Sequence, residues 1–160
     1  MLLAFVENDQ IKNGICYLPA TDELFYAVSG EGAYCNNKRI KVSGVEELKR
    51  ASIILDPGYD PEGDIKVANL YQKLRPNVGN VGAFNANGYT LAMLAKGETA
   101  GFVHFSSKIW ECSSLLIAQE AGAMITDFKG EELKLNFASD SGFEFVATNS
   151  LIHNELLTHF

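Results

Sequence analysis

The sequence predicts an α/β chain, a layered α+β sandwich in which an antiparallel meander precedes a mixed sheet with flanking helices. Short β-prone runs separated by polar turns occupy the first 42 residues. From about residue 50 onward, strand-like apolar runs alternate with segments of helical spacing. A length of 160 residues is sufficient for one well-buried core. We therefore expect a meander over residues 1–43 and an α/β domain over residues 44–160.

The expected meander consists of short runs rich in aliphatic, β-branched and aromatic residues. Polar residues 7–10 separate the first two runs, and Gly30-Glu31-Gly32 separates the third from the fourth. Asn36-Asn37 provides the last turn, because asparagine tolerates the left-handed backbone that tight turns require. The expected strands are Leu2–Val6, Ile11–Leu18, Glu23–Val28, Gly32–Cys35 and Arg39–Val42.

In the second part of the chain, helices are expected where apolar residues recur every three or four positions. Short continuous apolar runs predict buried strands. Residues 129–142 are expected to be mostly loop, and the small residues at 79–83 to form a loop before a helix. The expected strands are Ser52–Leu55, Thr99–Phe105, Met124–Thr126 and Phe143–Ala147, and the expected helices are Asp64–Leu74, Asn87–Lys96, Cys112–Ala121 and Leu151–His159.

Composition argues against several classes of protein. Thirteen Lys and Arg against twenty Asp and Glu give a formal net charge of −7, so we expect no nucleic-acid and no membrane partner. The three cysteines are odd in number and lack metal-finger spacing, which favours free thiols in a reducing compartment. The apolar residues 1–6 are too short for a membrane span and lack the features of a signal peptide. A cytoplasmic protein is therefore expected.

Two acidic segments are candidates for a metal site. Residues 56–64 place four carboxylates behind a predicted strand, but the prolines and glycines among them favour a solvated loop. For Trp110-Glu111, the residues alone favour a structural interpretation, with Trp110 as an apolar anchor and Glu111 in the first helical turn. The alternative interpretation is that Glu111 holds a metal over a pocket. Residues 79–83 are a weaker candidate, whose backbone amides could approach an oxyanion.

Several blocks in the right order resemble the inositol monophosphatase family. The early blocks follow its meander pattern, G-V-x-Y-x-P...E-L-F-x-A...G-x-G-A-x-x-N. The later blocks follow its W-D...E-A-G-G...T-D-x-x-G signature, and the likeness extends from residue 2 to residue 157. The matching blocks are residues 14–27, 30–36, 95–97, 110–111, 120–123, 126–130, 147–149 and 152–153.

The resemblance implies a Mg²⁺-dependent phosphomonoesterase that acts on a small phosphorylated metabolite. Attack on a phosphate needs cations that bridge its oxygens, and hard cations need several carboxylates. In the family most of these ligands come from a glutamate and a D-P-I-D-G-T loop before the meander. This chain resembles the carboxyl-terminal portion, which lacks those motifs. Residues 56–60 look superficially like that loop, but they follow the meander and lack the Gly-Thr, so we do not assign them to the site.

The resemblance also implies roles for individual residues. Glu111 is expected to be a metal ligand, in the place where the family has aspartate. Gly82, Ala83 and His104 are expected to bind substrate, and His104 stands where inositol-specific members carry an acid for the sugar hydroxyls. No catalytic residue is assigned, because no histidine pairs with a serine or cysteine at a recognisable nucleophile spacing.

Two classes of function follow. In the first, the chain is part of a Mg²⁺-dependent phosphatase for inositol, sugar or nucleotide phosphates, and is incomplete as an enzyme. In the second, it is a non-catalytic, truncated family member that acts as an assembly or interaction module. Because a meander without its family partners leaves a sheet edge or face exposed, we expect a homodimer.

Overall fold

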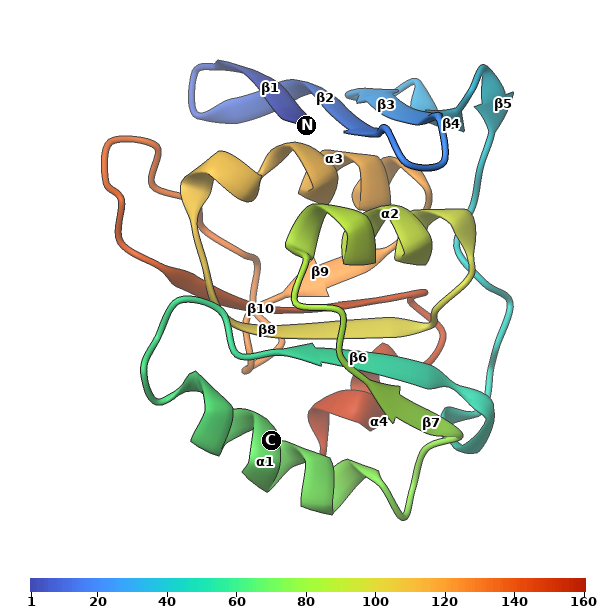
Figure 1. Cartoon of the computed structure of the whole chain (residues 1–160), viewed down its shortest axis with the longest axis vertical. Coiled ribbons are helices and arrows are strands. Elements are labelled where there is room, and N and C mark those ends of the chain that lie inside the picture. Colours follow the sequence, from blue (N-terminus) through green and yellow to red (C-terminus); the bar gives the residue numbers. More distant parts are fainter.

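The first sheet contains five antiparallel strands that are neighbours in the order of the sequence. The computed structural model describes residues 1–160, and this sheet is its outermost layer at the amino-terminal side (Figure 1). Left-handed residues in the turns, Asn8 and Asp9 and then Asn36 and Asn37, reverse the chain. The expected meander is confirmed. Its strands are β1 (Leu2–Glu7), β2 (Gln10–Leu18), β3 (Glu23–Val28), β4 (Gly32–Cys35) and β5 (Lys38–Arg39).

The second sheet is mixed, as expected, and has the strand order β7-β6-β8-β10-β9. The first three of these strands are parallel to one another, whereas β10 is antiparallel to both β8 and β9. The carboxyl ends of the three parallel strands therefore meet at one edge, where ligand sites form in open α/β sheets. The strands are β6 (Ser52–Asp56), β7 (Asn80–Gly82), β8 (Gly101–Ser107), β9 (Met124–Thr126) and β10 (Phe143–Thr148).

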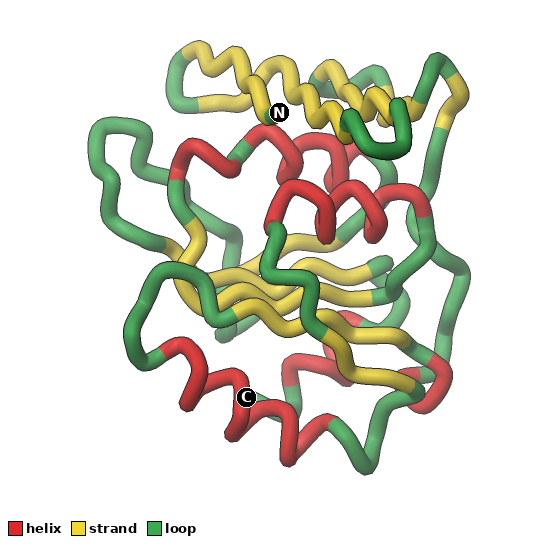
Figure 2. Tube along the Cα trace, viewed as in Figure 1, coloured by secondary structure: helices red, strands yellow, loops and turns green.

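Helices form two further layers, which Figure 2 shows in red. The middle layer lies between the sheets and contains α2 (Asn87–Lys96) and α3 (Ser113–Glu120). On the far face of the second sheet lie α1 (Gly63–Leu74) and α4 (His153–Leu157). None of the four helices combines the length and apolar character that crossing a bilayer requires.

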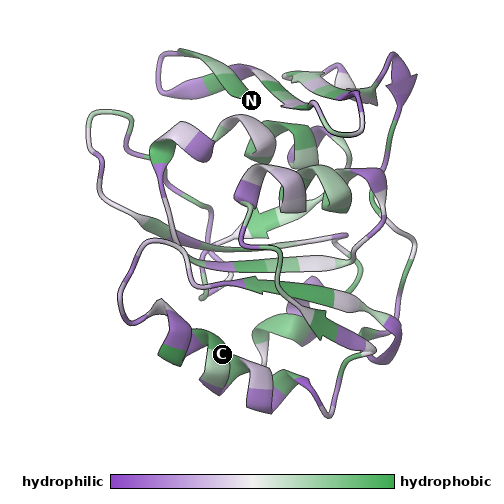
Figure 3. Cartoon of the chain, viewed as in Figure 1, coloured by the Kyte–Doolittle hydropathy of each residue, from purple (hydrophilic) through white to green (hydrophobic).

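The middle layer is buried on both sides. One group of its side chains packs on the first sheet and another on the second, so each helix joins two cores. Figure 3 shows hydrophobic residues on strands of both sheets, whereas β5 is hydrophilic. The side chains facing the first sheet include Ala92, Met93, Leu116 and Ile117, and those facing the second include Leu91, Leu94, Leu115 and Ala118.

The division of the chain into two domains, residues 1–43 and 44–160, stays a prediction.

Two sequence-based expectations for the strands are wrong. A loop was expected at residues 79–83, but Asn80–Gly82 forms β7, because β6 beside it supplies a parallel partner. A strand was expected at Arg39–Val42, but β5 ends at Arg39. The chain leaves the sheet there, and Val42 N donates to Ala121 O at 3.0 Å at the end of α3.

β2 and α3 approach each other closely at Gly14. A Cβ atom at this position would overlap the carbonyl group of Ser113, the first residue of α3. Only glycine allows this separation between the sheet and the helix. Gly14 therefore fixes the distance between the first sheet and the middle layer.

Replacement of Gly14 by alanine is expected to lower the free energy of unfolding by about 1–3 kcal/mol, because the helix must shift away from the sheet. Gly44 is a matched control, since a Cβ there meets nothing within 4 Å. Gly44→Ala is expected to change stability by less than about 1 kcal/mol. Urea unfolding of both variants tests this, and equal stability of the two would contradict the close approach.

Candidate functional site

A cavity of about 300 Å³ opens at the carboxyl ends of the parallel strands. β6 and the loop after it contribute residues 56–59, and β8 contributes His104. The first turn of α2 and the segment before it contribute residues 85–87, and the 3₁₀ turn before α3 contributes Glu111. The fold therefore places two of the predicted site residues, His104 and Glu111, in the lining of one cavity.

Asp56 and His104 are direct partners in the parallel ladder between β6 and β8. Their side chains lie on the same face, with Asp56 Oδ1 3.8 Å from His104 Nε2, which is too long for a hydrogen bond. Asp56 is only 6% exposed, and its Oδ1 accepts a hydrogen bond from Gly58 N at 2.9 Å. The expected solvated loop is therefore wrong for Asp56, because strand pairing carries this residue into the sheet.

The neutral tautomer of His104 is assigned from its surroundings. Ser106 N donates to His104 Nδ1 at 3.2 Å, so the proton of the neutral ring is on Nε2. The ring packs against Phe102 and Phe145, each with a centroid distance of 5.5 Å. This burial lowers the pKa of His104 to about 4, against the opposing effect of the Asp56 carboxylate. At neutral pH His104 is an uncharged hydrogen-bond donor.

Glu111 is oriented by three hydrogen bonds to one of its oxygens. Its Oε2 accepts from Ser107 Oγ at 3.1 Å, from Lys108 N at 3.2 Å and from Asn87 Nδ2 at 3.3 Å. The bond to Lys108 N is the contact that an acid three residues into a turn makes with the preceding backbone. No protein group donates to Oε1, which is left available to a cation or a ligand.

Trp110 is not the buried anchor that the residues alone suggested. It is 57% exposed, as is Tyr59, and the two rings meet edge to face with centroids 6.0 Å apart. Tyr59 also lines the cavity, whereas Trp110 lies outside its lining and contacts it only through Tyr59. The 3₁₀ turn Ile109–Glu111 therefore exposes Trp110 while Glu111 lines the cavity.

Gly82 and Ala83 lie outside the lining of this cavity. Gly82 is the last residue of β7 and pairs with Ile54 of β6. Ile54 precedes Asp56 by two residues on that strand. Both residues are thus on the same edge of the sheet as the cavity, and Asn85 and Asn87 line it in their place. A role for Gly82 and Ala83 in binding substrate stays a prediction.

The cavity offers a partial ligand set for a divalent cation. Asp56 and Glu111 are its two carboxylates, and no three His, Cys, Asp or Glu residues are grouped closely enough to hold a metal ion. Mg²⁺ usually keeps several waters and takes one or two protein carboxylates together with substrate phosphate oxygens. Glu111 fits as one such ligand through Oε1. A complete set of carboxylates is not supplied by these residues.

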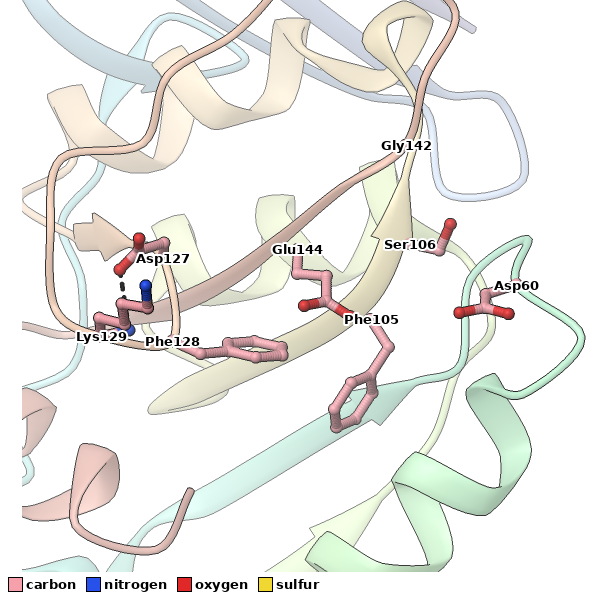
Figure 4. A pocket seen from close by; sticks show the side chains of 8 residues that line it. All are labelled: Asp60, Phe105, Ser106, Asp127, Phe128, Lys129, Gly142 and Glu144. Atoms are coloured by element: carbon pink, nitrogen blue, oxygen red, sulfur yellow. Dashed lines mark hydrogen bonds between the residues drawn. The ribbon is translucent and has the colours of Figure 1, made fainter.

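The largest cavity lies on the opposite face of the second sheet and measures about 650 Å³. Phe105 follows His104 on β8, so its side chain points to the opposite face of the sheet. Figure 4 shows Phe105 among the residues that line this cavity. Its acids already have partners. Lys66 bridges Asp60 and Glu144 at 3.0 and 2.9 Å, and Asp127 Oδ1 accepts two backbone N–H groups. We therefore place the candidate site in the smaller cavity.

Comparison with known proteins matches the whole chain to one family. The sequence model of the inositol monophosphatase family matches residues 1–160. A fructose-1,6-bisphosphatase/inositol-1-monophosphatase of Thermotoga maritima is 30% identical, over 97% of this chain and 57% of its own length. A putative Nus factor SuhB of Neisseria meningitidis is 29% identical, over 97% of this chain and 58% of its own length.

The solved structures agree with this match. An IMPase from Thermotoga maritima superposes with a TM-score of 0.84 at 29% identity, covering 99% of this chain and 59% of that one. The chain therefore spans a little over half the length of the proteins that it matches. The expected layered α+β architecture is confirmed by this superposition and by the two sheets.

Acidification is expected to destabilise the chain through His104. Its folded pKa lies below its ordinary value of 6.5, so the unfolded chain takes up the proton first as the pH falls. The contribution of neutral His104 to the free energy of unfolding is complete above pH 6.5 and is lost progressively toward pH 4. At most about 2 kcal/mol of it is lost by about pH 5. Burial also lowers the pKa of His153, which adds a dependence of the same sign.

Urea unfolding between about pH 7.5 and about pH 5 measures how the free energy of unfolding changes with pH. His104→Gln is expected to flatten this dependence, and His159→Gln, near the carboxyl end, is the control. Unchanged pH dependence in His104→Gln would show that His104 is not buried as the neutral form.

Proposed function

Because the chain belongs to the inositol monophosphatase family, we propose that it carries part of the site of a Mg²⁺-dependent phosphatase. The proposed substrate is a small phosphomonoester: an inositol, sugar or nucleotide phosphate. The relative from Thermotoga maritima, named for fructose bisphosphate and inositol monophosphate, supports this class. Since the chain spans about 57% of that relative, we propose that it is incomplete as an enzyme.

One observation carries the proposal: Glu111 and His104 face one cavity, and Glu111 is held so that its Oε1 is unoccupied by protein donors. A carboxylate fixed in this way is suited to bind Mg²⁺, which polarises a phosphate when it is bound. In this proposal Glu111 is a metal ligand, and Gly82, Ala83 and His104 contact the organic part of the substrate. The remaining metal ligands come from the substrate phosphate, water and groups outside this chain.

We also propose a cytoplasmic location. Cys16, Cys35 and Cys112 are all buried free thiols, and burial raises the pKa of each. Unpaired cysteines of this kind are typical of a reducing compartment.

Phosphate release tests the enzymatic proposal. The purified chain is expected to release phosphate slowly from at least one of inositol phosphates, fructose bisphosphate and adenosine bisphosphate, only when Mg²⁺ is present. Glu111→Gln is expected to lower the rate at least about tenfold, because it removes an anionic ligand. Glu131→Gln changes an exposed glutamate elsewhere and is expected to have no effect. No release from any substrate, together with no Mg²⁺ binding by calorimetry, would leave only the non-catalytic alternative.

The second candidate is an assembly or interaction module, and the first sheet favours it. β1 is an edge strand; Leu3 and Phe5 on it are 59% and 56% exposed, and Met1, directly before it, is 72% exposed. Strand pairing aligns Leu3 with Ile15 and then with tyrosines of β3 and β4, so the outer face is apolar across several strands. The name of the Neisseria relative, a putative Nus factor, also points to partners other than substrates.

We propose that a second copy of this chain covers the outer face, as a homodimer. Light scattering after size exclusion is expected to give twice the mass of the chain at about 100 μM, a concentration at which weak dimers of this kind form. Leu3→Glu combined with Phe5→Glu is expected to give the monomer mass. Ile65→Glu, at a 64% exposed apolar site on α1, is the matched control and leaves the dimer intact. A wild-type monomer at every concentration would refute the homodimer.

A further inference from the structure

The loop between β9 and β10 contains a strand-like segment, residues 132–136, which belongs to neither sheet. Its burial alternates: Leu133 and Leu135 are half-buried, whereas Lys134 and Asn136 are exposed. The two leucines pack against the core cluster between α3 and the second sheet. A period of two with one buried face is the pattern of a β-strand.

The main chain of this segment lacks partners on one side. An isolated bridge joins Glu132 to β9, the edge strand of the second sheet, and Asp127 N donates to Glu131 O at 3.0 Å. The carbonyl of Glu131 therefore points toward β9. Main-chain groups alternate in direction along a strand, so those of Glu132, Lys134 and Asn136 point away from β9. The N–H groups of these three residues and the C=O groups of Glu132 and Lys134 make no hydrogen bond to the protein.

A groove of about 330 Å³ accompanies the segment. It lies between the β9–β10 loop and the turn that joins β1 to β2, which are on the same side of the molecule in Figure 1. Leu133, Leu135 and Phe137 line one wall, and Ile11 on β2 and Leu116 on α3 add apolar surface. A strand added beside the segment would direct every second side chain to the face of its leucines, and so into the groove.

The charge of the groove is negative. Asp9 and Glu120 are in its lining, and no lysine, arginine or histidine is. Glu120 accepts two backbone N–H groups from the turn between β3 and β4, whereas the carboxylate of Asp9 has no protein partner. Lys134 is exposed on the other face of the segment. A basic partner is therefore favoured, as it also is by the net charge of −7.

These features together select the class of partner. A row of free N–H and C=O groups is matched by another main chain, which adds as a strand. A second copy of this chain is a poor match, because its own segment is preceded by Glu131 and begins with Glu132, which would add negative charge to an acidic groove.

We propose that residues 132–136 bind an extended basic segment of another protein, which adds as a strand beside them. Apolar side chains at every second position of the partner fill the groove, and a lysine or arginine reaches Asp9. The groove shares no residue with the cavity that contains Glu111, so this inference goes beyond the proposed phosphatase and does not rest on it.

A short peptide tests the groove on the wild-type chain. The probe is acetyl-Lys-Val-Arg-Val-Lys-Val-Arg-amide, titrated into the ¹⁵N-labelled chain. Saturable shifts are expected at the amides of residues 132–137 and of Ile11, with a Kd of about 1 mM or tighter. At saturation, amide hydrogen exchange of Lys134 and Asn136 is expected to slow at least about tenfold, while that of Leu135 between them is unchanged.

Modified peptides separate charge from main-chain pairing. Replacement of every Lys and Arg of the probe by Glu is expected to weaken binding at least about fivefold. Two further peptides carry N-methyl groups on alternate amides, one on each edge of the strand. The isomer whose methylated edge faces the segment is expected to bind at least about fivefold more weakly than the other, because it loses main-chain hydrogen bonds.

A variant of the chain tests the contact with Asp9. Asp9 has a left-handed backbone with φ 56°, which asparagine also tolerates, so Asp9→Asn is expected to fold. It is expected to bind the basic peptide about two- to fivefold more weakly. Asp64→Asn, at an exposed acid on α1, is the matched control and leaves the affinity unchanged.

The outcomes that would overturn the inference are distinct. They are equal affinity for the basic and acidic peptides, equal affinity of the two methylated isomers, full affinity in Asp9→Asn, and no saturable shift at residues 132–137. Conversion of a dimer to the monomer mass by the peptide would show that a second copy occupies the groove, and would also overturn it.

Discussion

The burial of α2 and α3 between two sheets is the constraint on which the rest of the structure depends. Most side chains of both helices are buried, and they contribute to the two clusters on either side. Because such helices have no face left for solvent, each sheet must present a complementary apolar surface. Close contact between Gly14 and Ser113 then fixes the spacing. Loss of either sheet would expose the middle layer to water.

The same layer positions the candidate site. α2 begins at Asn87 and α3 follows directly after the turn that contains Glu111, so both residues enter the cavity from helices whose places are set by packing. Asp56 and His104 come from adjacent parallel strands below them. The hydrogen bond from Asn87 to Glu111 joins the starts of the two helices. Site geometry is therefore a consequence of the layered core.

Local signals in the sequence are sufficient to predict most helices and strands. The elements and site residues that the sequence does not reveal depend on contacts between distant parts of the chain. The Asn36-Asn37 turn and the helical spacing after Gly63 carry their own information, and both were predicted. β7 was missed because its hydrogen bonds come from β6, and Asp56 was missed because its neighbours suggest a turn while its register with His104 buries it. Glu111 and His104 were indicated by family resemblance. The buried Oδ1 of Asn87, which has no hydrogen-bond partner, depends on contacts from distant residues and has no signature in the sequence.

The central claim is that a cation binds through Glu111 in the smaller cavity, rather than among the acids of the larger one. Titration of the ¹⁵N-labelled chain with Mg²⁺ in the presence of inorganic phosphate tests it most directly. Saturable shifts are expected at the amides of Ser107, Lys108 and Glu111 and at the side-chain amide of Asn87, and they should vanish in Glu111→Gln. Shifts centred on Asp60, Asp127 and Glu144, or no saturable shift anywhere, would contradict the claim.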